Sequence, residues 1–330
     1  MARFLLDPSV AIKQYDSLSH MGEVWYNIKT NPEVGKVLEE KTKAIFTSTG
    51  MGNLFHIKDK KRAIVLLQGE KTEEIKKMVN EGVSGFIVDN EMDLNRLLKV
   101  TDDTRLFLRL KFKEHTIYTG KYFVYGIDWN RASEIIDRLP LDKIGIHLHR
   151  KTQNIGEWSL SRDLAPIIEK LEGKITSVNI GGGLPFNYHN SNPNLTPILE
   201  RIKELGKNLK EKNMKLIMEP GRYICAPAVR LETKIINSYD KNLIVDASIY
   251  NSAMDTFLFH IRLPVENETE RGHQYLIKGR SPDSLDMFRY KVFFKEEKKI
   301  GDQIIFLNAG AYNFHTEFSD LPKIKTEIVK

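Results

Sequence analysis

Cysteine is almost absent from this 330-residue sequence, in which Cys225 is the only one. A single thiol excludes an internal disulfide framework and leaves too few thiolates for a cysteine-based metal site. A protein without disulfides fits a reducing compartment. We therefore expect a cytoplasmic protein, and we predict no metal cofactor.

Long apolar runs and long runs of one charge are also missing. No apolar run reaches the roughly 18 residues that a membrane span needs, and polar residues interrupt the N-terminus too early for a secretory signal. The net charge of +6 comes from lysines mixed with glutamates, as in residues 295–299. Such runs are typical of solvated faces, so we expect a small-molecule partner and neither nucleic acid nor membrane.

What is present is an alternation of short apolar runs with amphipathic stretches between about residues 20 and 220. This pattern is typical of βα units around a parallel sheet, and the chain is long enough for a second domain. The predicted strands are residues 24–28, 44–47, 63–67, 85–88, 106–110, 144–148, 177–180 and 215–218. The predicted helices include residues 71–81, 91–99, 130–138, 160–171 and 194–211. This number and order favour an α/β fold of the (β/α)8 or TIM-barrel type over an open doubly wound sheet.

The pattern changes after Arg222 to β-type runs separated by turns. The predicted strands here are residues 230–235, 243–246, 274–277, 290–294 and 303–307. We therefore predict a barrel over residues 8–222 and an all-β C-terminal domain over residues 223–330.

Candidate site residues follow the predicted barrel strands, because barrel active sites gather at the carboxyl ends of the strands. Lys29 follows the first strand, and desolvation there would lower its pKa and favour a Schiff base with an aldehyde. A lysine reaching into solvent at the rim is the alternative. His149 follows another strand and could stack on a flat ring, although most single histidines do not.

Glycines and a glutamate follow two further strands. Residues 181–183 are three glycines whose amides could approach a phosphate closely, although a tight turn would also explain them. Glu219 could hold a protonated ring nitrogen, although an ion pair with Arg222 is the simpler alternative. Each of these signals is weak by itself.

Six motifs in order resemble one family, the fold-type III pyridoxal-phosphate decarboxylases that include ornithine and diaminopimelate decarboxylases. Residues 26–32 read YNIKTNP and resemble YAVKAN, and residues 179–185 read NIGGGLP and resemble DIGGGFP. Residues 219–223 are EPGRY, and His149 sits where the family has its ring-stacking histidine. Residues 279–286, GRSPDSLD, are similar to GPTCDGLD, and residues 310–313, GAYN, are similar to GAYT.

The resemblance implies pyridoxal 5'-phosphate as cofactor and a role for each matching residue. Lys29 would carry the cofactor, Glu219 would hold the ring nitrogen and His149 would stack on the ring. The phosphate would be held by Gly182, Gly183, Arg222 and Tyr312. Arg109 resembles the family's strand arginine near the cofactor, and Gly221 belongs to the matching EPGR segment. The family's first strand usually joins the β domain, so residues 1–7 would belong there.

Substrate recognition is implied by the second domain. Asp283 matches the aspartate with which the ornithine branch reads a distal ammonium group, and it would act with Lys29, His149 and Glu219 in catalysis. In the family this segment reaches the site of a partner chain, which implies a homodimer with shared sites. Phe259 aligns with a second acidic residue of ornithine decarboxylases, and Pro282 replaces the family cysteine.

Two further departures concern the barrel. Asn179 stands in place of the aspartate of DIGGGFP, and residues 46–50 lack the usual acid after phenylalanine. Both lie at the ends of predicted strands.

The sequence therefore predicts decarboxylation of a basic amino acid, of the ornithine or lysine type, for polyamine or related amine biosynthesis. Diaminopimelate, or a modified amine-bearing amino acid of polyamine or siderophore synthesis, is an alternative substrate. A racemase of the same fold is disfavoured because no matching tyrosine motif is found. A catalytically weak, decarboxylase-like regulator is the alternative from another class.

Overall fold

The computed structural model describes residues 1–112, 125–139 and 143–329. These residues form two compact units. The first unit comprises Tyr15–Pro185 and Asn194–Gly221, and the second comprises Met1–Gln14, Phe186–Pro193 and Arg222–Lys330. None of the helices among the described residues is long and apolar enough to cross a membrane.

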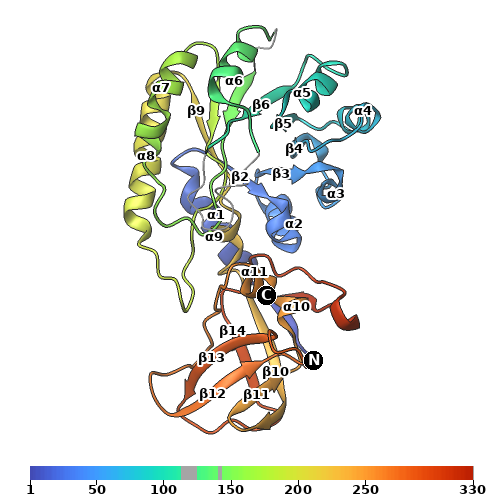
Figure 1. Cartoon of the computed structure of the whole chain (residues 1–330), viewed down its shortest axis with the longest axis vertical. Coiled ribbons are helices and arrows are strands. Elements are labelled where there is room, and N and C mark those ends of the chain that lie inside the picture. The colour runs from blue at the N-terminus through green and yellow to red at the C-terminus, as the bar shows by residue number, and fades with distance from the viewer. Residues whose placement is uncertain (113–124, 140–142, 330) are drawn as a thin grey trace. The chain divides into compact units, whose positions relative to one another are not determined.

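The first unit contains eight parallel strands that close into a barrel (Figure 1). The strands are β2 (Glu23–Asn27), β3 (Ile45–Thr49), β4 (Ala63–Leu66), β5 (Gly85–Val88), β6 (Arg105–Arg109), β7 (Ile144–His147), β8 (Ser177–Asn179) and β9 (Lys215–Met218). Each strand pairs with the next one along the chain, and β9 closes the barrel on β2 through the pairs Glu23 to Ile217 and Val24 to Met218. The predicted (β/α)8 fold is confirmed.

Apolar side chains from five different strands fill the barrel interior. They form a buried cluster of Trp25, Ile64, Ile87, Phe107 and Ile217. The rings of Trp25 and Phe107 meet edge to face with centroids 5.2 Å apart. Such a filled interior makes the barrel a packed core, so polar side chains are found at the strand ends.

Helices alternate with the barrel strands and lie around them (Figure 1). They are α2 (Pro32–Lys41), α3 (Gly50–Leu54), α4 (Thr72–Asn80), α5 (Glu91–Leu98), α6 (Trp129–Ile136), α7 (Leu160–Leu171) and α8 (Leu195–Glu211), and α1 (Pro8–Ser19) precedes β2. The sequence signalled α4 to α8, but α1, α2 and α3 were not among the helices named. The start of α2 is well specified, since the side chain of Asn31 accepts hydrogen bonds from the amides of Glu33 and Val34 and Pro32 occupies the first turn.

The second unit is built on a seven-stranded sheet in the order β13-β12-β11-β10-β1-β15, with β14 paired to β10. Its strands are β1 (Arg3–Leu6), β10 (Val229–Tyr239), β11 (Asn242–Val245), β12 (His273–Lys278), β13 (Met287–Phe294), β14 (Gln303–Phe306) and β15 (Lys325–Ile328). Strand β1 runs antiparallel to β10 and parallel to β15. The stacked rings of Phe288 and Phe306, 4.6 Å apart, lie in its core. The prediction of a mostly β second part is confirmed.

Short helices accompany this sheet, in a region where the sequence predicts β-type runs with turns and few helical stretches. They are α9 (Gly221–Cys225), α10 (Ile249–Ser252) and α11 (Met254–Leu258). Each has four or five residues, too few for a helical periodicity to be recognised in the sequence.

Candidate active site

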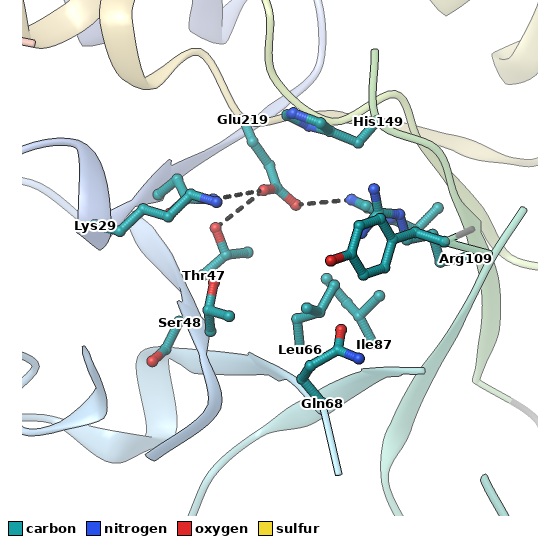
Figure 2. A pocket seen from close by; sticks show the side chains of 13 residues that line it. Lys29, Thr47, Ser48, Leu66, Gln68, Ile87, Arg109, His149 and Glu219 are labelled. Carbon is teal, nitrogen blue, oxygen red and sulfur yellow. Dashed lines mark hydrogen bonds and ion pairs between the residues drawn. The ribbon is translucent and has the colours of Figure 1, made fainter. Parts of the chain in front are cut away.

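A cavity of about 350 Å³ lies in the barrel unit and collects most of the strand-end candidates (Figure 2). Its volume is in the usual range for small-molecule sites. The side chains that line it are Asn27, Lys29, Thr47, Ser48, Thr49, Leu66, Gln68, Ile87, Arg109, Tyr125, His147, His149 and Glu219. Four predicted site residues, Lys29, Arg109, His149 and Glu219, thus face one cavity.

The carboxylate of Glu219 is the best-anchored group in this cavity. It is 4% exposed and accepts hydrogen bonds from Asn179 Nδ2 at 2.7 Å and from Thr47 Oγ1 at 3.0 Å. A longer contact of 3.5 Å comes from Asn27 Nδ2. Burial raises the pKa of Glu219, while these donors and the charge of Lys29 oppose the rise. The carboxylate is therefore held by neutral groups.

Lys29 lies in a single 3-10 turn, Ile28–Thr30, that follows β2 directly. Its side chain lines the cavity and points into it (Figure 2). The side chain remains accessible to solvent there. Desolvation lowers the pKa of this amine, the charge of Glu219 opposes the shift, and the charge of Arg109 adds to it. A lowered pKa increases the fraction of neutral amine, the form that attacks an aldehyde.

Two histidine side chains, His147 and His149, line the same cavity as Lys29. His149 accepts a hydrogen bond at its Nδ1 from the amide of Gly182 at 3.3 Å. Desolvation, together with repulsion from Arg109 and Lys29, lowers the pKa of His149 to about 3, so its ring is neutral at physiological pH. His147 is buried with its Nε2 3.6 Å from Glu219 Oε1, and burial also lowers its pKa well below 6.5.

The three glycines have a packing reason for being glycine. Gly181 and Gly183 have φ angles of +66° and +98°, and a Cβ on either would lie 2.3 Å from Leu148 O or 2.6 Å from Lys151 O. A Cβ on Gly182 would lie 2.9 Å from the Glu219 carbonyl oxygen. These positions exclude other residues by backbone conformation and space. The phosphate role of Gly182 and Gly183 therefore stays a prediction.

Gly221 is restricted in the same way. A Cβ there would lie 2.3 Å from Thr30 Oγ1. The backbone at Gly221, just after β9, therefore lies close against Thr30 in the turn that carries Lys29.

The second unit holds the other predicted phosphate residues, Arg222 and Tyr312. The guanidinium of Arg222 lies 5.2 Å from the centre of the Tyr312 ring. Both terminal nitrogens of Arg222 donate to the carboxylate of Asp255, and one of them also donates to Tyr188 Oη at 3.0 Å. Sequence reasoning missed Asp255 and Tyr188, which lie 33 and 34 residues from Arg222.

The predicted substrate residues also lie in the second unit. Asp283 is half-buried, and its carboxylate accepts hydrogen bonds from the amide of Leu285 at 2.7 Å and from the phenol of Tyr250. Phe259 follows α11 directly and is 51% exposed, and Pro282 is exposed as well. The roles of Asp283 and Phe259 stay predictions.

The donors to Glu219 are what sequence reasoning overlooked in the barrel. Asn179 and Thr47 were noted only as departures from the family motifs, yet both donate to this carboxylate. The signal was available, since both positions carry a neutral donor where the family has an acid. His147 could have been found from its spacing, because it ends β7 two residues before His149 and an extended chain directs side chains two residues apart to the same side.

A barrel with a desolvated lysine and a buried carboxylate in one cavity fits a class of cofactor-binding barrel enzymes, and the comparison with known families agrees. Residues 12–226 match the family described as "Pyridoxal-dependent decarboxylase, pyridoxal binding domain". The chain belongs to this family, whose cofactor is pyridoxal phosphate. The predicted resemblance and the predicted cofactor are confirmed.

The individual relatives include ornithine, lysine and diaminopimelate decarboxylases. The chain is 22% identical over 253 residues to the lysine/ornithine decarboxylase of Selenomonas ruminantium, covering 72% of this chain and 64% of that protein. It is 24% identical over 366 residues to a probable ornithine decarboxylase of Dictyostelium discoideum, covering 96% and 77%. A crystal structure of lysine/ornithine decarboxylase complexed with cadaverine from Vibrio vulnificus has a TM-score of 0.85 at 22% identity, covering 100% of this chain and 93% of that one.

Proposed function

We propose that this protein decarboxylates a basic amino acid, of the ornithine or lysine type, with pyridoxal 5'-phosphate as cofactor. The observation that carries the proposal is the joint presence of Lys29 and Glu219 in one barrel cavity, the first with a lowered pKa and the second as a buried carboxylate. Membership of the decarboxylase family supports it.

The side chains of the cavity fit this cofactor. The amine of Lys29 would bind its aldehyde, the carboxylate of Glu219 would hold the proton on its ring nitrogen, and the neutral ring of His149 offers a flat apolar face. When bound, the protonated ring supplies a sink for the electron pair left by departing carbon dioxide. Thr47 and Asn179 hold the Glu219 carboxylate in place, so its charge is oriented before the ring arrives.

Recognition of the substrate would fall to the second unit. The Asp283 carboxylate can form a charge-assisted hydrogen bond with a distal ammonium group. The exposed ring of Phe259, in place of a second acid, favours a substrate whose distal part is also apolar. A modified amine-bearing amino acid of polyamine or siderophore synthesis would fit such a ring, and diaminopimelate is a further alternative substrate. A homodimer with shared sites and a cytoplasmic location belong to this proposal as predictions.

Absorbance tests the proposal directly. The purified protein should show a visible band with pyridoxal 5'-phosphate, and borohydride should abolish it. Lys29→Ala should lack the band, whereas Lys36→Ala, which removes a half-buried lysine of α2 paired with Glu33, should keep it. A wild-type protein that stays colourless would refute cofactor attachment. Release of carbon dioxide from ornithine, lysine, arginine and diaminopimelate would then identify the substrate, and activity confined to diaminopimelate would contradict the role of Asp283.

A weakly catalytic regulator is the second candidate, and Pro282 favours it. The family has a cysteine at this position that helps to protonate the product carbon, and proline has no side-chain proton donor. A coloured protein that releases no carbon dioxide from any of the four amino acids would support the regulator.

A further inference from the structure

The guanidinium of Arg222 is paired with a carboxylate inside its own unit. Its two terminal nitrogens donate to the two oxygens of Asp255, with 3.1 Å between Nη2 and Oδ1 and a closer contact to Oδ2. This is the parallel, two-bond geometry by which an arginine holds one planar anion. Asp255 therefore occupies the face of Arg222 that is best suited to an anionic ligand.

Both partners of this pair are buried. Arg222 and Asp255 are each 4% exposed, and the ring of Tyr188 lies beside the guanidinium with its centre 5.6 Å away. Burial raises the pKa of Asp255, and the charge of Arg222 opposes that rise. An unpaired guanidinium in such a place would be strongly destabilising, so Arg222 needs a counter-ion.

The proposed function gives Arg222 a second anion, the phosphate of the cofactor. Phosphate and carboxylate compete for the same guanidinium because both use its paired N–H groups. Two anions beside one cation also repel each other across a few ångströms of protein, where the interaction is only weakly screened.

We propose that Asp255 is a positioning residue that shares Arg222 with the cofactor phosphate and thereby lowers the affinity for the phosphorylated cofactor. In the free protein Asp255 supplies the charge that keeps Arg222 buried and oriented. When phosphate is present, that same charge opposes its binding. The inference rests on the proposed function, because it takes the phosphate to be a ligand of Arg222.

A matched control exists in the same unit. Arg289 is 1% exposed, and its Nη1 and Nη2 donate to the two carboxylate oxygens of Glu268 at 3.3 Å and 2.7 Å. This pair has the same two-bond geometry, but neither residue belongs to a segment that matches the family motifs or lines the cavity around Lys29. Glu268→Gln therefore removes the half-buried counter-ion of a buried arginine without touching Arg222.

The experiment compares pyridoxal 5'-phosphate with pyridoxal, which lacks the phosphate. Each is titrated into the full-length apo-protein while the visible band and the thermal melting midpoint are followed. In Asp255→Asn we expect roughly tenfold tighter binding of pyridoxal 5'-phosphate and a larger rise of its melting midpoint than in the wild type. Binding of pyridoxal should be unchanged. Asp255→Glu, which restores the charge, should behave as the wild type, and Glu268→Gln should melt earlier without any change in either affinity.

An unchanged or weaker affinity of Asp255→Asn for pyridoxal 5'-phosphate would overturn the proposal. Asp255→Ser, which leaves room for water, replaces Asp255→Asn if the latter does not fold. If neither variant folds even with pyridoxal 5'-phosphate present, phosphate cannot substitute for the carboxylate and the proposal is wrong. A failed proposed function would be recognised separately, since the wild type would then show no borohydride-sensitive band.

Discussion

The two units of this protein each contain a buried carboxylate, and the two are compensated in opposite ways. In the barrel, Glu219 is held by the neutral donors Asn179 and Thr47. In the second unit, Asp255 faces the guanidinium of Arg222. Burial raises the pKa of both groups. Hydrogen bonds from neutral donors leave a negative charge available to a ligand, whereas an ion pair cancels it.

Because of this difference, we expect the Glu219 carboxylate to contribute mainly to function and the Asp255 carboxylate mainly to stability. A carboxylate that keeps its charge can act on a cationic group in its cavity, and its removal leaves only neutral donors behind. A carboxylate that neutralises a buried cation cannot be removed without stranding that cation. The contrast can be tested by variants at the two sites.

The largest expected effect is on stability, at the second site. Asp255→Ala should lower the free energy of unfolding by about 3–5 kcal/mol, because it leaves Arg222 buried without a counter-ion. Glu219→Ala should cost about 1–2 kcal/mol, because it leaves two neutral donors without an acceptor. Denaturant unfolding of the apo-proteins measures both values. Equal losses would remove the distinction between the two carboxylates.

The next effect is on catalysis, at the barrel site. Glu219→Gln should lower kcat by about 100-fold or more, since a preorganised charge facing the reacting group is lost. Carbon dioxide release with the preferred substrate measures it. The control is Glu204→Gln on the exposed face of α8, which should leave kcat unchanged. A Glu219→Gln enzyme with nearly normal kcat would mean that this carboxylate does not act on the ring.

Removal of one donor to Glu219 should have a smaller effect. Thr47→Val should lower the free energy of unfolding by about 1 kcal/mol and reduce kcat several-fold, because the carboxylate loses a hydrogen bond that fixes it. Thr233→Val is the matched control, since its buried hydroxyl donates to the backbone oxygen of Ile304 in the β sheet at 2.8 Å. It should lose comparable stability and keep its kcat. The same drop in kcat for both variants would show that Thr47 acts only through stability.

The smallest expected effect is a shift along the pH axis. The neutral amine of Lys29 reacts with the cofactor, so the rate at which the visible band forms should rise with pH up to a midpoint below 10.5. Glu219→Gln removes an attraction that raises the pKa of Lys29 and should move this midpoint to lower pH. Arg109→Gln removes a repulsion that lowers it and should move the midpoint to higher pH. Shifts of about half a unit to one unit are expected, and shifts in the same direction would contradict this assignment.

The barrel could be read from the sequence because its strands are short buried runs between amphipathic stretches. Strand β15 could not, since its residues Lys325–Ile328 are largely exposed and carry no apolar pattern. Helix α2 was overlooked because Gly35 interrupts it, although Asn31 and Pro32 mark its start.

The candidate site divides in the same way. Lys29, His149 and Glu219 share a position after barrel strands, so the fold itself brings them to one cavity. No comparable rule predicts the position of Asp255, because its pairing with Arg222 depends on how α11 packs in the second unit. The departure from the family motif at Asn179 is informative, because an asparagine amide can donate a hydrogen bond to a neighbouring carboxylate and an ionised aspartate cannot.

The place of β1 has a consequence for how the protein is made. Residues Arg3–Leu6 pair with Val229–Glu232 on one side and with Lys325–Ile328 on the other. A ribosome releases the first of these segments long before the last, so β1 has to wait for more than 300 residues of synthesis before both its edges are covered. The barrel strands pair with close neighbours along the chain and can assemble in the meantime, with only the closing contact of β9 on β2 spanning the whole unit. Until then both edges of β1 are open to pairing with other chains, so this strand needs protection during translation.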